Sequence, residues 1–315
     1  MNFHPTRAPA GRAVSVGVVL PPRLPAQRFL ELAAVAEDHG ADSVWVFDHL
    51  QPFTASGSWL ECWTALTLAA ARTSRVRVGP QVLCQSFRSP TLLAKMATTL
   101  DTAIGGRLEV AVGAGWHEPE YRAFGFDFPD ARTRFAQTVE YMEILRPGLA
   151  GEVTTFAGAH YRAEAMQCAP ASPQAGGPPL TLGAAGQDML RLGARLADNL
   201  NLPSTAVRGD VGKWAARVAS ACEQAGRDRA TLGLTLQVPV AIGKSRAAAK
   251  AAIDADPGAA AVGHPETTGI FGSVEECRDT LGQWAALGVD EVQCVMPVTE
   301  GVGESVGLLV DAACA

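Results

Sequence analysis

Short apolar runs alternate about eight times with segments of helical spacing along this chain of 315 residues. The runs are rich in β-branched residues, which is typical of strands buried on both faces. Strands are predicted at 14–20, 43–47, 76–83, 108–112, 180–182, 199–202, 232–242 and 291–296. Helices are predicted at 25–39, 59–72, 90–103, 131–145, 187–196, 211–225, 245–253 and 273–287. Eight such units predict an α/β protein with a closed (β/α)8 TIM barrel, and an open doubly wound sheet is the alternative.

Three long segments interrupt the alternation. They are residues 114–130 after strand four, 148–179 before strand five and 255–272 before the last helix. Long irregular insertions in a compact domain are usually functional loops or lids, so we expect 148–179 to cover part of the barrel mouth. Residues 1–12 are polar and rich in Pro, which predicts a disordered arm before a single domain over 13–315.

Composition excludes several classes of protein. The net charge of −6 argues against binding to nucleic acid or to an anionic membrane surface. The seven cysteines include no CxxC pair, which indicates reduced thiols and no zinc site, and we expect no metal. No apolar run reaches the ~18 residues of a membrane span, and no signal peptide is recognisable, so a cytoplasmic location is predicted.

In a barrel of this kind the residues just after the strands build the active site. That rule selects Asp48 and His49 after strand two, Gln81, Val82, Cys84 and Arg88 after strand three, 113–121 after strand four, 183–186 after strand five, and Asn199 and Asn201 in strand six. Histidine is the natural acid or base near neutral pH, which makes His49 a catalytic candidate. A structural hydrogen bond or a loop cap is the alternative role for it.

Two glycine-rich turns have more than one interpretation. Gly183, Ala184, Ala185 and Gly186 join a strand to a helix, where small residues let backbone N–H groups approach a phosphate. The same turn could be only a tight connection. The Gly113–Gly115 turn has the same ambiguity, and Trp116 and Tyr121 either wall a flat ring or pack the loop.

Other catalytic classes lack their motifs. No GxSxG nucleophile elbow occurs, and strand one carries no metal ligand. Strand one runs into Pro21 and Pro22, which have no N–H donors and cannot cradle a pyrophosphate as GxGxxG does.

Several segments together resemble the luciferase-like monooxygenase superfamily, in register over roughly residues 14–296. They are HGADSVWVFDH (39–49), RSPTLLAKMATTLD (88–101), GGR (105–107), GAGWHEPEY (113–121), TLGAAG (181–186), ADNLN (197–201), VEEC (274–277) and ALGVD (286–290). The stretch SVWVFDHLQPF at 43–53 is most similar to the branch that uses the deazaflavin coenzyme F420.

The resemblance implies roles for individual residues. His49 would donate or accept the proton while hydride moves at the deazaflavin ring, and Asp48 would contact the cofactor. Gln81, Val82 and Cys84 align with a bulge that supports the ring, commonly through a non-prolyl cis peptide. Ala114, Gly115 and the turn at 183–186 align with segments that touch the cofactor side chain and phosphate.

The substrate side is less defined by the resemblance. Glu120 aligns with an acidic position there and is a second catalytic candidate, and Phe53 retains an aromatic wall in the pocket. Trp116 stands where sugar-phosphate dehydrogenases of this branch place a glutamate, so a sugar-phosphate substrate is not expected.

The resemblance therefore implies an F420-dependent oxidoreductase that moves hydride between the deazaflavin and a small organic substrate. An FMN-dependent monooxygenase fed by a separate flavin reductase is the alternative, because both cofactors present a flat tricycle and a phosphate. A non-catalytic flavin-binding paralogue is a second alternative. The resemblance also implies a homodimer.

Overall fold

Nine parallel strands form the central sheet in the computed structural model, which describes residues 3–52, 57–204, 210–256, 258 and 263–314. They are β1 (Ser15–Leu20), β2 (Ser43–Val46), β3 (Arg77–Pro80), β4 (Leu83–Cys84), β5 (Val110–Gly113), β8 (Leu180–Gly183), β9 (Asn199–Leu202), β10 (Gly233–Gly243) and β12 (Glu291–Val295). Their order is β3-β2-β1-β12-β10-β9-β8-β5-β4.

The two ends of this order belong to one strand, because β3 and β4 are the halves of the predicted third strand. The ring closes where Val78 bridges Leu108 beside β5. The Val78 N–H donates to Arg107 O at 2.9 Å, and the Glu109 N–H donates to Val78 O at 2.9 Å. The predicted (β/α)8 barrel is therefore confirmed, and the open sheet is excluded.

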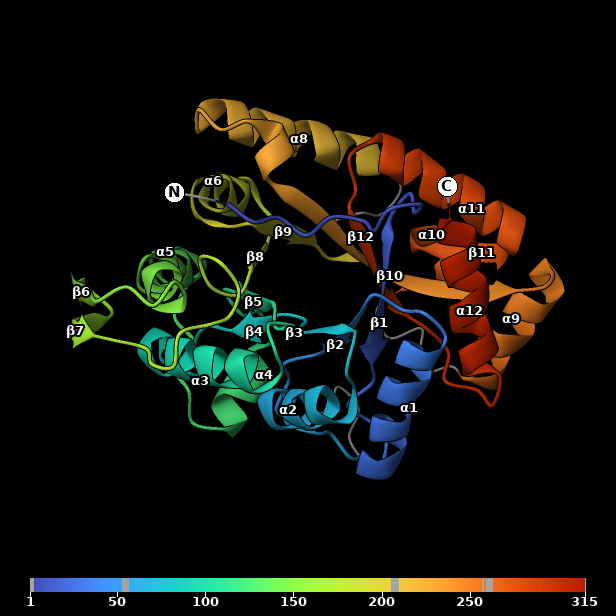
Figure 1. Ribbon diagram of the computed structural model, residues 1–315, viewed down its shortest axis with the longest axis horizontal. Helices are drawn as coiled ribbons and strands as arrows, with labels where there is room; N and C mark the ends of the chain where they lie inside the picture. Colours follow the sequence, from blue (N-terminus) through green and yellow to red (C-terminus); the bar gives the residue numbers. More distant parts are fainter. Residues whose placement is uncertain (1–2, 53–56, 205–209, 257, 259–262, 315) are drawn as a thin grey trace.

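Helices surround the barrel (Figure 1). They are α1 (Ala26–Asp38), α2 (Cys62–Arg72), α3 (Pro90–Ala103), α4 (Glu118–Ala123), α5 (Ala131–Leu149), α6 (Gln187–Leu196), α8 (Val211–Gln224), α9 (Arg246–Ala255), α10 (Pro265–Thr268), α11 (Val274–Ala286) and α12 (Val302–Ala313). The predicted capping box is present, since Ser273 accepts from the Glu276 N–H and Glu276 accepts from the Ser273 N–H. Among the described residues, no helix is long and apolar enough to cross a membrane.

Trp45 fills the middle of the barrel interior. It is fully buried, and an ideal Cβ at Gly17 or at Gly79 would come within 2.6 Å or 2.3 Å of its indole. The two flanking strands therefore need glycine opposite this ring, because interiors are close-packed and leave no spare volume. The Trp45 Nε1–H donates to Ser43 Oγ at 2.7 Å, which satisfies the indole.

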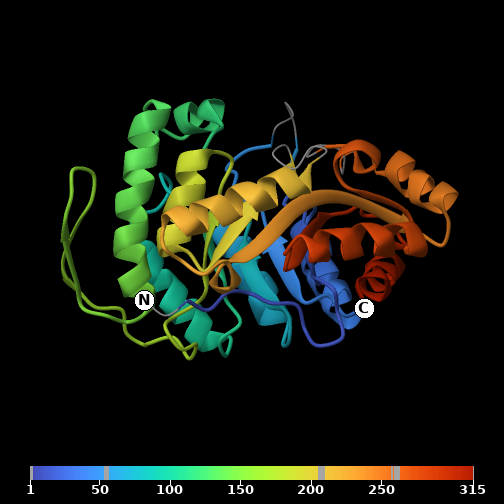
Figure 2. The ribbon, with the colours of Figure 1, turned by 90° about the horizontal axis from the view of Figure 1, so that it is seen from above.

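The predicted disordered arm is wrong for the residues that can be described. Residues 3–12 cross the N-terminal end of the barrel (Figure 2). The Thr6 N–H donates to Asn199 Oδ1 and its Oγ1–H to Glu109 Oε2, both at 2.8 Å. Arg7 pairs with Asp290 at 2.6 Å. The arm is ordered because it supplies hydrogen bonds to polar groups that would otherwise be buried without partners.

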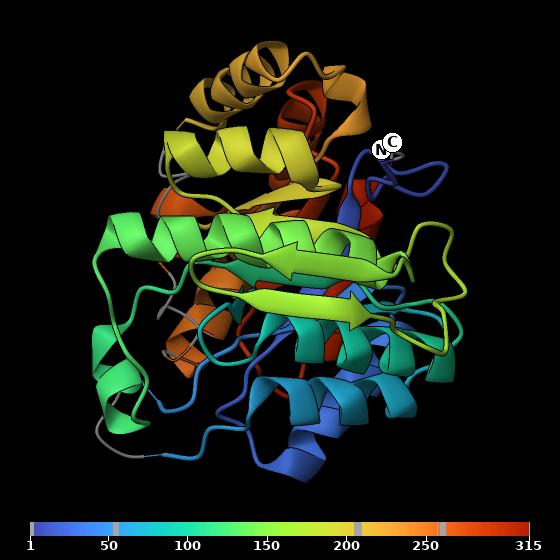
Figure 3. The same cartoon turned by 90° about the vertical axis from the view of Figure 1, so that its left-hand side faces the viewer.

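The segment 148–179 also differs from its prediction as a cover of the mouth. It forms an antiparallel hairpin, β6 (Thr154–Ala157) and β7 (Arg162–Met166), on the outside of α5 (Figure 3). Further along, Ser172 and Gln174 bond to Asp101, at the end of α3. The reason is topological: a helix-to-strand connection begins and ends at the N-terminal end of the strands, away from the mouth.

The segment 255–272 lies closer to the mouth. Its strand β11 (Ile270–Ser273) extends the sheet beside the outer half of β10. Asp256 accepts from Arg23 at 2.6 Å and from the Val298 N–H at 2.8 Å, which ties this segment to the ends of β1 and β12.

Candidate active site at the barrel mouth

The carboxylate of Asp48 ties the end of β2 to its neighbours. It accepts two-pronged hydrogen bonds from Arg88 at 3.0–3.2 Å and one from the Cys84 N–H at 2.8 Å. Arg88 also pairs with Glu61. Burial raises the pKa of Asp48, and the Arg88 guanidinium acts in the opposite direction. The side chain is thus held by protein groups, and its predicted contact with a cofactor stays a prediction.

His49 is paired with Glu120 from α4. His49 Nδ1 lies 3.0 Å from Glu120 Oε1, and the side chains are 14% and 2% exposed. Burial acts to raise the pKa of Glu120, but hydrogen bonds from His49 and from the Leu50 N–H outweigh it and lower the pKa. Glu120 is therefore ionised at neutral pH and can only accept, so His49 Nδ1–H is the donor of this hydrogen bond.

Aromatic rings surround His49 edge to face. The ring centroids of Trp116, Trp59 and His117 lie 5.7, 6.3 and 6.1 Å from that of His49. Trp116 is 65% exposed. The sequence prediction missed Trp59 because it placed that residue in a helix, whereas α2 begins only at Cys62 with Glu61 as its N-cap. Phe53, the other predicted pocket residue, lies outside the described residues.

The bulge in the third strand lies between β3 and β4. The peptide bond between Gln81 and Val82 is cis, as the resemblance implies. An ideal Cβ at Gly113 or Gly183 would lie 2.8 or 2.9 Å from Val82 Cγ2. Glycine at these two positions therefore makes room for Val82, a reason that the turn pattern alone did not suggest.

Cys84 and Tyr121 pack together beneath the turn at Gly115. Cys84 Sγ lies 2.8 Å from Tyr121 Oη. Burial raises the pKa of Cys84 to about 11, so it is a thiol at neutral pH. Gly115 has φ +75°, and a Cβ there would lie 1.9 Å from Tyr121 Oη. The packing role of Tyr121 is thus the observed one, and Ala114 beside it is half-buried.

The turn after β8 opens onto the N-terminus of α6. Gly186 is the N-cap and makes no side-chain cap hydrogen bond, and nothing lies within 4 Å of an added Cβ there. Ala184 is buried and its N–H donates to Asn201 O at 2.9 Å, whereas Ala185 is exposed. A ten-residue helix whose first N–H groups have no side-chain cap suits an anionic group such as a phosphate.

The mouth also contains an acceptor that lacks a donor. Gln81 Oε1 is buried and has no hydrogen-bond partner within the described part of the chain. Three features of the mouth fit one ligand. Gln81 Oε1 could accept from a donor group, the N-terminus of α6 could bind a phosphate, and the surface around Val82 could contact a flat ring. A flavin or deazaflavin carries all three groups.

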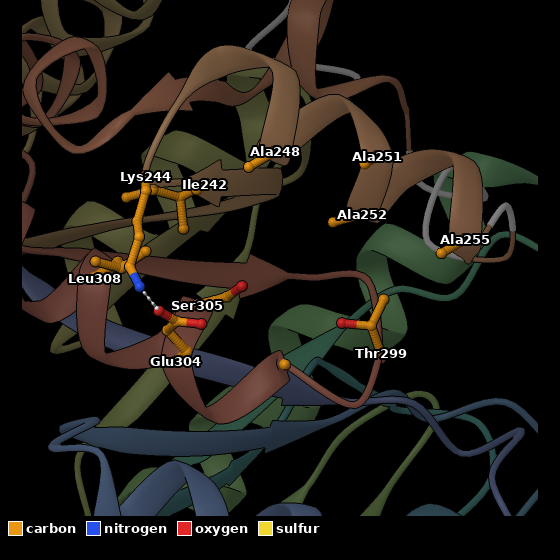
Figure 4. Close-up of a pocket in the computed structure, with 12 residues that line it drawn as sticks. Ile242, Lys244, Ala248, Ala251, Ala252, Ala255, Thr299, Glu304, Ser305 and Leu308 are labelled. Carbon is orange, nitrogen blue, oxygen red and sulfur yellow. Dashed lines mark ion pairs between the residues drawn. The ribbon is translucent and has the colours of Figure 1, made fainter.

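A separate pocket of about 340 Å³ lies between β10, α9 and α12 (Figure 4). Four alanines of α9 line one side of it, and the exposed Lys244 and Glu304 form an ion pair at its edge at 2.7 Å. None of the predicted site residues lines it. The chemistry of the chain therefore points to the mouth and away from this surface pocket.

Comparison with known proteins agrees with the fold. The family model for luciferase-like monooxygenases matches residues 3–262. The chain is 30% identical over 292 residues to an F420-dependent hydroxymycolic acid dehydrogenase of Mycobacterium tuberculosis, covering 91% of this chain and 79% of that one. It is 35% identical over 174 residues to an F420-dependent glucose-6-phosphate dehydrogenase of Nakamurella multipartita, covering 53% of this chain and 49% of that relative. This second alignment thus spans about half the length of the relative.

A solved structure shares the whole fold. It is an F420-dependent secondary alcohol dehydrogenase in complex with an F420-acetone adduct, with a TM-score of 0.79, 20% identity and coverage of 95% of this chain and 99% of that one. The family match over most of the chain shows that this protein belongs to the luciferase-like monooxygenase family.

Proposed function

We propose that this protein is an F420-dependent oxidoreductase that transfers hydride between the deazaflavin and a small hydroxyl- or carbonyl-bearing substrate. The observation that carries the proposal is the His49–Glu120 pair at 3.0 Å, next to the bulge at Val82. The relatives named above support the cofactor, since both are called F420-dependent dehydrogenases.

The bound deazaflavin would supply a ring carbon that carries hydride but reacts poorly with oxygen. The residues of this chain do the rest. The N-terminus of α6 binds the phosphate, and Val82 supports the ring. Glu120 holds the His49 tautomer whose Nε2 takes the proton of a substrate hydroxyl as hydride leaves the adjacent carbon. In the reverse direction the same nitrogen returns the proton to the alkoxide.

The rings of Trp59, Trp116 and His117 favour a substrate with an apolar or aromatic group beside its reacting carbon. Both relatives act, by their names, on hydroxyl-bearing compounds. Trp116 in place of the glutamate of sugar-phosphate dehydrogenases makes an unphosphorylated substrate the better match. We also propose a cytoplasmic homodimer, which light scattering of the purified protein would test.

The test is a fluorescence titration of the purified apoprotein with coenzyme F420 and with FMN, followed by anaerobic turnover of a panel of secondary alcohols. Micromolar binding of F420 and alcohol-dependent reduction of it are expected. Binding of FMN alone, with oxygen consumed as product forms, would instead establish a monooxygenase that depends on a flavin reductase. Binding without turnover of any substrate would favour the non-catalytic paralogue.

A further inference from the structure

A chain of buried hydrogen bonds crosses the barrel interior from the mouth to the N-terminal end. Gln81 Nε2–H donates to Asn201 Oδ1 at 3.0 Å, and Asn201 Nδ2–H donates to Gln293 Oε1 at 2.7 Å. Gln293 Nε2–H donates to Glu291 Oε2 at 3.3 Å. We refer to these four side chains as the amide relay. All four are buried, and they come from three places around the barrel: Gln81 follows β3, Asn201 is in β9, and Gln293 and Glu291 are both in β12.

The direction of the relay is set at its Glu291 end. Trp45 Nε1–H can only donate, so Ser43 Oγ accepts from it and donates its own O–H to Glu291 Oε1. Arg77, which has no acceptor, donates to the same oxygen at 3.3 Å. When it is ionised, Glu291 thus accepts at Oε1 from the barrel wall, and its other oxygen, Oε2, accepts from Gln293.

Each amide then orients the next one. Because the Gln293 NH2 donates to Glu291, the Gln293 Oε1 points toward Asn201. Asn201 therefore donates to it through its own NH2. The Asn201 NH2 is also satisfied by Thr235 Oγ1 at 2.8 Å. Asn201 Oδ1 therefore faces Gln81 and takes its NH2. The Gln81 NH2 is thus used in this hydrogen bond, and its Oε1 is the buried acceptor that has no partner among the described residues.

We infer that Gln81 is a specificity-determining residue whose Oε1 accepts the ring N–H of the bound deazaflavin, and that Asn201, Gln293 and Glu291 are positioning residues that keep this oxygen presented. The inference rests on the proposed function, because it concerns the same mouth. Its physical basis is that a buried acceptor left without a donor is costly, so a ligand that brings a donor gains affinity. A ligand with a methyl group on that nitrogen gains nothing and adds a clash.

The experiment compares the affinity of coenzyme F420 with that of an analogue methylated at the ring N–H, by fluorescence titration at about pH 8.5, where Glu291 is ionised because its pKa is about 7. The preference of each protein is the ratio of the two dissociation constants. The wild-type protein should prefer F420. The preference should fall about tenfold in Gln81→Leu, which is the usual worth of one buried hydrogen bond. It should also fall in the isosteric Glu291→Gln, whose side-chain amide can donate to Gln293 and lets the relay reverse.

The matched control is Gln85→Leu. Gln85 is equally buried, but it bonds to Ser86, Gln137 and Tyr161 outside the relay. Its variant should keep the wild-type preference even if its thermal stability falls. A purely structural role for the relay would alter melting temperatures without moving the preference.

Two results overturn the inference. An unchanged preference in Gln81→Leu removes Gln81 as the acceptor, and an unchanged preference in Glu291→Gln removes the directional relay. If wild type binds FMN but not F420, the proposed function fails. The inference can still be tested, because FMN carries the same ring N–H and its affinity can be compared with that of its N3-methyl derivative. Binding of neither pair overturns both.

Discussion

The two ends of the barrel both carry ion pairs among buried side chains. They differ in how completely the polar groups around those pairs are hydrogen-bonded. At the N-terminal end Arg77 lies between Glu109 and Glu291, and Thr6 from the arm completes the cluster. At the C-terminal end Arg88 lies between Asp48 and Glu61 in a similar arrangement.

Around the second cluster, however, some hydrogen-bonding groups are left unsatisfied and some aromatic surface is exposed. Gln81 Oε1 has no donor within the described residues, α6 begins without a side-chain cap, and Trp116 is largely exposed. The comparison shows that charged residues in a barrel do not by themselves mark a site. Incomplete hydrogen bonding and exposed apolar surface do, because both are costs that a ligand can relieve.

The largest expected effect is at the mouth. His49→Ala should lower turnover ~10²–10⁴-fold, the usual worth of general acid–base catalysis, while F420 affinity changes little. Steady-state kinetics and a fluorescence titration measure the two quantities. His160→Ala, at an exposed histidine on the hairpin side, is the control. Normal turnover in His49→Ala would leave this residue with a structural role only.

The next effect is at the N-terminal end and concerns stability. Arg77→Met leaves two buried carboxylates without their cation, which should cost about 3–5 kcal/mol of unfolding free energy. Arg75→Met is the matched control, since Arg75 is 67% exposed and lies 4.0 Å from Glu37, and it should cost less than about 1 kcal/mol. Urea denaturation measures both. Equal losses for the two variants would contradict the distinction between them.

The pH dependence of stability should report on Glu291. Burial raises its pKa from 4.5 to about 7, with Arg77 opposing and Glu109 adding to the rise. The folded protein therefore holds this proton at pH values where the unfolded chain has released it. The contribution of Glu291 to stability is present below pH 4.5 and is lost as pH rises to about 7.

Denaturation of wild type and Glu291→Gln at a series of pH values between about 5 and 8 would test this. The difference in stability between the two proteins should shift in favour of the glutamine variant as pH rises. A difference that stays constant over the whole series would show that Glu291 does not titrate there.

The smallest effect concerns the arm. Thr6→Val removes the hydroxyl that donates to Glu109 at 2.8 Å and accepts from Arg77 at 2.7 Å. The loss should be about 1–2 kcal/mol of stability with F420 affinity and turnover unchanged. Thermal melts and the same titration measure these quantities. A loss of cofactor affinity in this variant would mean that the two ends of the barrel are coupled through the interior.

Much of the architecture could be predicted from the sequence, because it depends on local patterns. Buried apolar runs such as 14–20 and 43–47 alternate with helical spacing, and only a parallel barrel or an open sheet suits eight such units. The rule that strand ends build the site then selected His49, Gln81 and Gly183, and the structure brings all three to one mouth.

Other features were decided by the tertiary structure alone, because they depend on which distant groups the closed ring brings together. The pairing of His49 with Glu120 spans 71 residues, and the position of Trp59 depends on where α2 begins. Residues 3–12 carry no periodic pattern and are ordered only because they meet unsatisfied polar groups at the N-terminal end. The relay from Glu291 to Gln81 likewise exists only in the folded chain. Glu291 and Gln293 are neighbours on β12, but Asn201 and Gln81 are each oriented by a side chain from a distant part of the sequence, which no local spacing encodes.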